Sequence, residues 1–187
     1  MLSFLRIALA GAAMLALTAA APLPAQLGSD VTVTLAGGPH AGTYSLTSKE
    51  TCEFQDWMKE EPPRFIGSFQ TWIGPNSKRK LEPSEIAEVS LIVPDVRAPK
   101  PGVLMLGVTF GDLSNRKNPG TFYLVNTVPL EMRNDIEREM MGGKIVAGRG
   151  DVKIDRQGDK ATVTFWGVTQ EGVRIDGVIQ CPKIRSY

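Results

Sequence analysis

The alternation of apolar and polar residues over 160–181 constrains the fold more than any other feature of this sequence. The segment reads KATVTFWGVTQEGVRIDGVIQC, and its odd-numbered positions are mostly apolar on both sides of a turn at 170–172. A repeat of two residues is that of an extended strand with one buried face. The segment therefore predicts a β-hairpin, and Cys181 points into the core because it shares the phase of the apolar residues.

Further short strands are expected upstream, separated by turns rich in glycine and proline. A bulge is expected at Gly67, and the nearly continuous apolar run 103–110 favours a strand that is covered on both faces. The expected segments are 31–35, 44–46, 65–73, 86–93, 103–110, 121–125 and 152–154.

Together with the hairpin, these segments predict an all-β domain, an antiparallel β-sandwich of about nine short strands. A closed β-barrel is the alternative. The long proline-containing loops favour the sandwich, because an up-and-down barrel would use mostly tight hairpins. One segment, 129–141, lacks the alternation and reads PLEMRNDIEREMM. Pro129 suits a first helical turn and Gly142 a C-terminal stop, so a short helix or an irregular crossing is expected there.

Residues 1–25 have the pattern of a cleaved secretory signal peptide. Arg6 precedes an uncharged apolar run, 7–17, which is followed by small residues and prolines. The run is shorter than the about 20 residues that a membrane-spanning helix needs. Cleavage after Ala21 and cleavage after Ala25 both remain open. We therefore expect residues 26–187 to form a single exported domain, periplasmic or extracellular, without membrane insertion after signal cleavage.

The charge of the mature chain is balanced. The full chain has 21 basic and 20 acidic residues, and removal of Arg6 with the signal equalises them. Nonspecific binding to nucleic acid or to acidic membranes needs a basic excess. We expect no nucleic-acid partner and a monomer.

The chain has two cysteines, Cys52 and Cys181. In an exported protein such a pair predicts one disulfide. A redox or metal-binding role is disfavoured, because the two are far apart and neither belongs to a C-x-x-C motif.

Catalytic chemistry has little support in the sequence. The single histidine, His40, lies in a glycine-rich turn and is expected to be exposed and inert, which leaves a serine or cysteine nucleophile without a base. No metal site, phosphate-binding glycine loop or cofactor is indicated. The RGD tripeptide at 149–151 is interpreted as the entrance to a strand. The basic run 78–80 is interpreted as a solvated loop. Paired carboxylates are the remaining enzymatic class, and the nearby candidates are Glu53, Asp56, Glu60 and Glu61.

Two tryptophans are the candidate binding residues. Trp166 is out of phase with the buried residues of its strand, and Trp57 lies in the most irregular loop. Each is either covered by a neighbouring loop, which is favoured, or exposed to a ligand. The leading hypothesis is a non-catalytic binding or structural module at the cell envelope, with an unknown protein or glycan as its partner. A carrier of a small apolar ligand, with a barrel-like cavity, is the alternative, and a carboxylate-dependent hydrolase ranks last.

Overall fold

A computed structural model describes residues 28–55, 63–71, 80–117, 119–129 and 147–186. Every regular element in these ranges is a β-strand. The expected signal peptide and nearly all of the expected helix or crossing at 129–141 lie outside the described residues. The strands are β1 (Ser29–Ala36), β2 (Gly42–Ser48), β3 (Cys52–Gln55), β4 (Arg64–Gln70), β5 (Ile86–Val93), β6 (Met105–Phe110), β7 (Thr121–Asn126), β8 (Arg149–Gln157), β9 (Lys160–Val168), β10 (Arg174–Cys181) and β11 (Ile184–Ser186).

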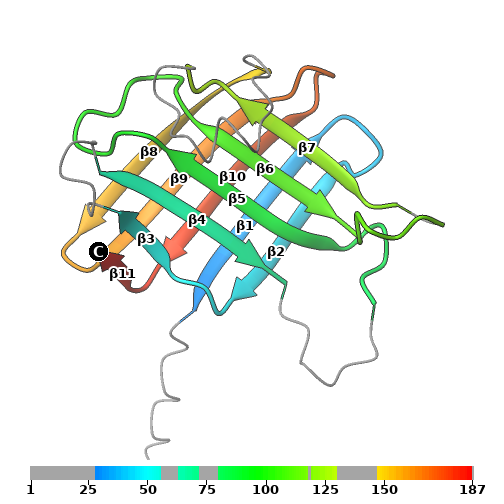
Figure 1. Ribbon diagram of the computed structural model, residues 1–187, viewed down its shortest axis with the longest axis horizontal. Coiled ribbons are helices and arrows are strands. Elements are labelled where there is room, and N and C mark those ends of the chain that lie inside the picture. The colour runs from blue at the N-terminus through cyan, green and yellow to red at the C-terminus, as the bar shows by residue number, and fades with distance from the viewer. Residues whose placement is uncertain (1–27, 56–62, 72–79, 118, 130–146, 187) are drawn as a thin grey trace, which may run out of the picture.

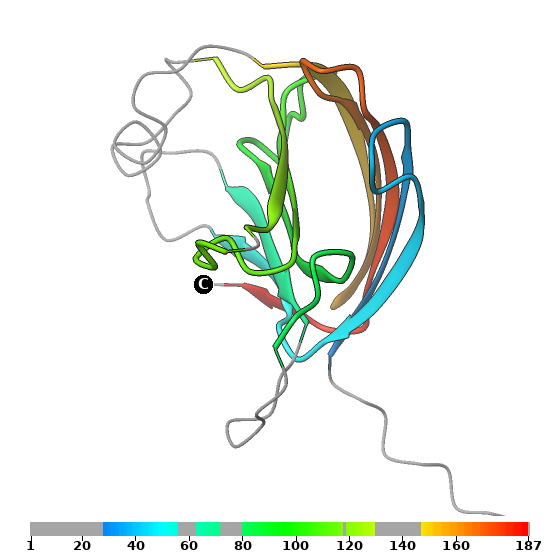
Figure 2. The same ribbon diagram turned by 90° about the vertical axis from the view of Figure 1, so that its right-hand side faces the viewer.

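The strands form two sheets that pack face to face (Figures 1 and 2). One sheet has five strands in the order β2-β1-β10-β9-β8, and the other has six in the order β11-β3-β4-β5-β6-β7. Each sheet keeps two edges of its own, so the alternative of a closed barrel is wrong. The expected β-sandwich is confirmed, and its pairs are antiparallel apart from β3 with β11.

The core lies between the sheets and is built by the alternation of side chains. In β1 every second residue is buried, and β9 and β10 follow the same rule. Since successive side chains of a strand point to opposite faces, each sheet presents one apolar face to the other. The largest fully buried side chains come from strands of both sheets and from Leu104, which precedes β6: Phe65, Phe69, Phe110, Phe165, Leu91, Leu104, Leu106, Ile175 and Ile179.

Two strands were not expected from the sequence, and they pair with each other. β3 and β11 run parallel, with Ile184 opposite Cys52. They span four and three residues, which is too short for a two-residue repeat to stand out. Their pairing adds an edge to the six-stranded sheet.

Two local expectations differ from the structure. Gly67 pairs regularly with Leu91, and the irregularity lies instead in β5, between Ile86 and Glu88. Gly67 leaves room for the ring of Phe69, which would lie 2.6 Å or less from an added Cβ. One face of the run 103–110 is fully buried, but the other is covered only in part, because Gly107 is buried there whereas Met105 and Thr109 are half-buried.

The expected disulfide between Cys52 and Cys181 is present and joins the two sheets. Cys52 belongs to β3 and Cys181 to β10, and their Cα atoms are 5.8 Å apart across a sequence separation of 129 residues. Their exposed fractions are 0% and 2%. The bond therefore connects the last long strand to the opposite layer inside the core.

Candidate binding surface

Trp166 lies on the face of the five-stranded sheet that points away from the core, which we call the outer face. Its neighbours in β9, Phe165 and Gly167, are buried, whereas Trp166 is half-buried. Across the sheet it stands opposite Asp176 of β10 and Asp151 of β8. The two-residue repeat of β9 thus places an indole among carboxylates on this face, one strand in from the edge strand β8 and near the end of β9.

An arginine is held over the indole of Trp166. The Cζ atom of Arg174 lies 5.3 Å from the ring centroid, within the range of a cation–π contact. Arg174 also donates two hydrogen bonds to Asp176, from Nε at 2.7 Å and from Nη2 at 2.6 Å. The side-chain hydrogen bond and then the charge of Asp176 raise the pKa of Arg174 above its ordinary value. These three residues, the Trp166 cluster, thus combine an aromatic ring with an ordered ion pair.

The rest of the outer face is rich in hydroxyl groups. Thr34 and Thr43 share a hydrogen bond of 3.0 Å between β1 and β2, and Thr47 donates to Asp30 at 2.6 Å. Cross-strand pairs of this kind stabilise a sheet and fix the side chains. The hydroxyl side chains on this face are Thr32, Thr34, Thr43, Ser45, Thr47, Thr162 and Thr164.

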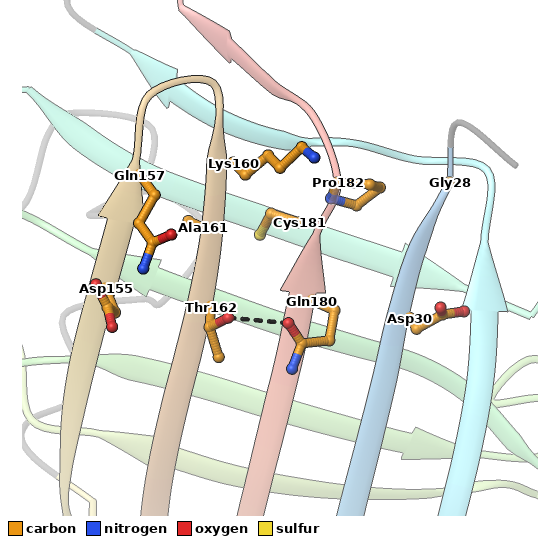
Figure 3. Close-up of a pocket in the computed structure, with 10 residues that line it drawn as sticks. All are labelled: Gly28, Asp30, Asp155, Gln157, Lys160, Ala161, Thr162, Gln180, Cys181 and Pro182. Carbon is orange, nitrogen blue, oxygen red and sulfur yellow. Dashed lines mark hydrogen bonds between the residues drawn. The ribbon is translucent and has the colours of Figure 1, made fainter. Parts of the chain in front are cut away.

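A hollow of about 370 Å³ lies at the end of this sheet that carries the disulfide (Figure 3). Four of its residues form one row across neighbouring strands, because Asp30 pairs with Gln180, Gln180 with Thr162, and Thr162 with Asp155. Thr162 and Gln180 are joined by a hydrogen bond of 2.9 Å. The hollow is lined by Gly28, Asp30, Asp155, Gln157, Lys160, Ala161, Thr162, Gln180, Cys181 and Pro182.

The two carboxylates of this hollow are far apart. Asp30 and Asp155 lie in β1 and β8, three strand spacings from each other, which is about 14 Å between backbones. Paired carboxylates in glycoside hydrolases are separated by roughly 5 to 10 Å. Of the acids considered from the sequence, Glu53 is half-buried in β3, and Asp56, Glu60 and Glu61 lie outside the described residues. Within the described ranges no three histidine, cysteine or acidic side chains gather as a metal site.

His40 is not the exposed, inert turn residue that its sequence context predicts. Its ring stacks on Phe110, with 4.3 Å between ring centroids. Nε2 lies 3.1 Å from the carbonyl oxygen of Pro83, and Nδ1 lies 2.8 Å from the hydroxyl of Tyr123. Because a carbonyl only accepts, Nε2 donates to Pro83, and in the neutral ring Nδ1 accepts from Tyr123. His40 therefore connects the loop between β1 and β2 to the six-stranded sheet, which the sequence could not reveal because its partners are distant in the chain.

The RGD tripeptide forms the start of β8. Gly150 is buried, and Oδ1 of Asp151 accepts hydrogen bonds from the backbone amides of Gly102 at 3.1 Å and Val152 at 2.9 Å. These bonds give Asp151 a structural role at the strand entrance. Of the basic run, only Lys80 is described.

A second hollow, of about 500 Å³, lies between β2 and the beginning of β5 and is open to solvent. It includes Tyr44 and Leu46 of β2 and Ile86 of β5. Two large apolar side chains are exposed elsewhere among the described residues, Leu113 at 55% and Phe122 at 50%. Phe122 lies on the six-stranded sheet, and its ring covers Gly107. It is therefore an exposed aromatic on the opposite side of the sandwich from Trp166.

Comparison of the chain with protein-family models, with curated proteins and with solved structures gave no match. In the part of the chain that the structure describes, no helix is both long and apolar enough to cross a membrane.

Trp57, the other candidate binding residue, lies outside the described residues. The hollow at the disulfide end of the five-stranded sheet was not predicted from the sequence, because its residues come together only through strand order and register. The strand phase alone indicates only which of these residues point outward.

Proposed function

We propose that this chain is an exported, non-catalytic binding module that binds a protein or glycan partner through the outer face of its five-stranded sheet. The observation that carries the proposal is Trp166, a half-buried indole on a hydroxyl-rich face, held beside the Arg174 and Asp176 pair. Tryptophan and arginine are the residue types that contribute most to binding surfaces. An ordered pair of this kind loses little side-chain entropy when a partner binds.

Export is supported by two features. The disulfide between Cys52 and Cys181 is compatible with an oxidising compartment. The first 25 residues have the charge and apolar pattern of a secretory signal. A location at the cell envelope or outside the cell is therefore proposed.

A binding role is favoured over catalysis and over transport of an apolar ligand. Both ring nitrogens of His40 are engaged in contacts that hold the fold together. A carrier needs an enclosed apolar cavity, whereas both hollows described above open to solvent and the first is lined mainly by polar side chains.

The proposal is tested by sedimentation of the purified, oxidised mature protein with cell envelopes isolated from the organism that produces it. We expect binding that saturates and weakens at least tenfold in Trp166→Ala. Phe122→Ala is the matched control, because it removes an exposed aromatic from the other sheet and should bind as the wild type does. Periodate treatment of the envelopes destroys glycan ligands and protease treatment destroys protein ligands, so the two partners are distinguished. Equal binding by wild type and Trp166→Ala, or no binding, would overturn the proposal.

A further inference from the structure

We propose that the hollow at the disulfide end of the outer face is a subsite for a hydroxyl-rich saccharide that is uncharged or carries amino groups. The inference rests on the proposed function, because it names the class of partner that this face would bind. Trp166 belongs to the same face but not to the hollow, so the two sites can be tested separately.

The polar groups around the hollow are available to a ligand. The side chains of Asp155, Gln157 and Lys160 have no hydrogen-bond or ion-pair partner among the described residues. Gln180 accepts at Oε1 from Thr162, which leaves its amide nitrogen to donate elsewhere. Figure 3 shows these side chains around one opening, contributed by β8, β9 and β10.

This set of groups matches the chemistry of sugar hydroxyls. Each hydroxyl both donates and accepts, so adjacent hydroxyls on a ring need acceptors and donors side by side. Asp155 and Asp30 accept, Lys160 donates, and the glutamine amides do both. Two carboxylates against one ammonium group make the hollow negative, which disfavours acidic sugars and favours neutral or amino sugars.

The lining disfavours a peptide as the ligand. Peptide recognition relies on pockets for large apolar or aromatic anchors, and the apolar side chains in this hollow are short, namely Ala161 and Pro182 beside the buried Cys181. The volume of about 370 Å³ is at the lower end of the range for small-molecule sites, roughly 300 to 1,000 Å³. A single sugar ring is of the size that such a hollow admits.

Trp166 extends the same surface. It lies four residues beyond Thr162 along β9, which corresponds to about 13 Å. A saccharide of several units could place one ring in the hollow and another against the Trp166 cluster, beside the indole that Arg174 covers. The ligand would then run along β9.

The end of the sheet at the hollow is fixed by the fold. Cys181 is held by the disulfide, and the backbone amide of Ile184 donates to the carbonyl of Asp159 at 2.6 Å. Asp159 belongs to the two-residue turn between β8 and β9, where Gly158 has a φ of 65°. These constraints fix the backbone of the turn from which the side chains of Gln157 and Lys160 extend, so that no backbone ordering is needed when a ligand binds.

The test is a titration of ¹⁵N-labelled oxidised protein, followed by two-dimensional NMR, with four trisaccharides. The probes are maltotriose and the trimers of N-acetylglucosamine, glucosamine and galacturonic acid. We expect at least one neutral or amino trimer to shift the backbone amides of Ala161, Thr162, Gln180 and Cys181 in a saturable way.

Two variants locate the site. Gln180→Ala and Asp155→Ala should each weaken the affinity at least tenfold. Lys153→Ala is the control, since Lys153 is an exposed residue of the same strand as Asp155 and does not line the hollow. It should bind as the wild type does.

The inference is overturned if no trimer shifts these amides, if only the acidic trimer does, or if the affinity is unchanged in both Gln180→Ala and Asp155→Ala. None of these results alters the sedimentation experiment with Trp166→Ala. A failed subsite is therefore distinguishable from a failed binding module.

Discussion

Gly177 of β10 stands directly opposite Phe165 of β9, and the aromatic ring of Phe165 occupies the space where a side chain on Gly177 would begin. Both residues face the core. A similar arrangement occurs in the six-stranded sheet, where the ring of Phe69 lies over Gly67. In each sheet a glycine thus makes room for a buried aromatic ring.

Gly177→Ala should therefore destabilise the fold by about 1 to 3 kcal/mol, because the new methyl group collides with a ring that has no space to retreat. The measurement is urea unfolding followed by circular dichroism. Phe165→Leu in the Gly177→Ala background should recover part of the loss, so that the two substitutions are coupled by about 1 kcal/mol or more. Strict additivity of the two would contradict this packing relationship.

Replacement of both cysteines by alanine should lower the free energy of unfolding by about 5 kcal/mol. The bond closes a loop with a separation of 129 residues, and in the chain-entropy model a loop of this length restricts the unfolded chain by about that amount. Ser29→Ala is the control, because the Ser29 hydroxyl lies 3.8 Å from Sγ of Cys52. It removes a neighbouring polar contact and keeps the cross-link, so it should cost no more than about 1 kcal/mol. A similar loss in both variants would show that the bond itself contributes little.

His40→Ala should cost about 2 to 3 kcal/mol, since it removes two hydrogen bonds and a ring stacked on Phe110. Tyr44→Phe is the comparison, because it removes only the hydrogen bond from the Tyr44 hydroxyl to the His40 carbonyl and should cost about 1 kcal/mol. Thermal or urea unfolding at neutral pH measures both. A cost for His40→Ala below about 0.5 kcal/mol would mean that His40 does not connect the sheets energetically.

Tyr123 should ionise above the usual range for a phenol. Burial raises its pKa, and the nearby backbone amide of His40 opposes this only in part. The folded state then holds the proton more tightly than the unfolded state, so the contribution to stability is complete below about pH 10 and is lost as the pH rises through the folded pKa. Ultraviolet titration at alkaline pH should show one late phenol that is absent in Tyr123→Phe. The free energy of unfolding of the wild type should also fall with rising pH more steeply than that of Tyr123→Phe. Parallel curves would contradict the raised pKa of Tyr123.

The sequence predicted the longer strands well because each has one buried face and a clear two-residue repeat, as in the hairpin that ends at Cys181. It also predicted that Trp166 points away from the core, since the phase of β9 fixes this locally. It missed the parallel pair of β3 and β11, because strands of four and three residues carry too few positions for a repeat to be recognised. It also misjudged His40, whose environment depends on Phe110 and Tyr123, residues distant in the chain.

The sequence by itself determined the all-β class, the inward and outward faces of the strands, and the identity of the disulfide partners. These follow from local periodicity and from the presence of only two cysteines. Only the tertiary structure decided that the sheets stay open as a sandwich, that Arg174 is held over Trp166, and that Asp30, Gln180, Thr162 and Asp155 form one row. Strand order and register depend on contacts between distant segments, and a local repeat contains no information about which strands become neighbours.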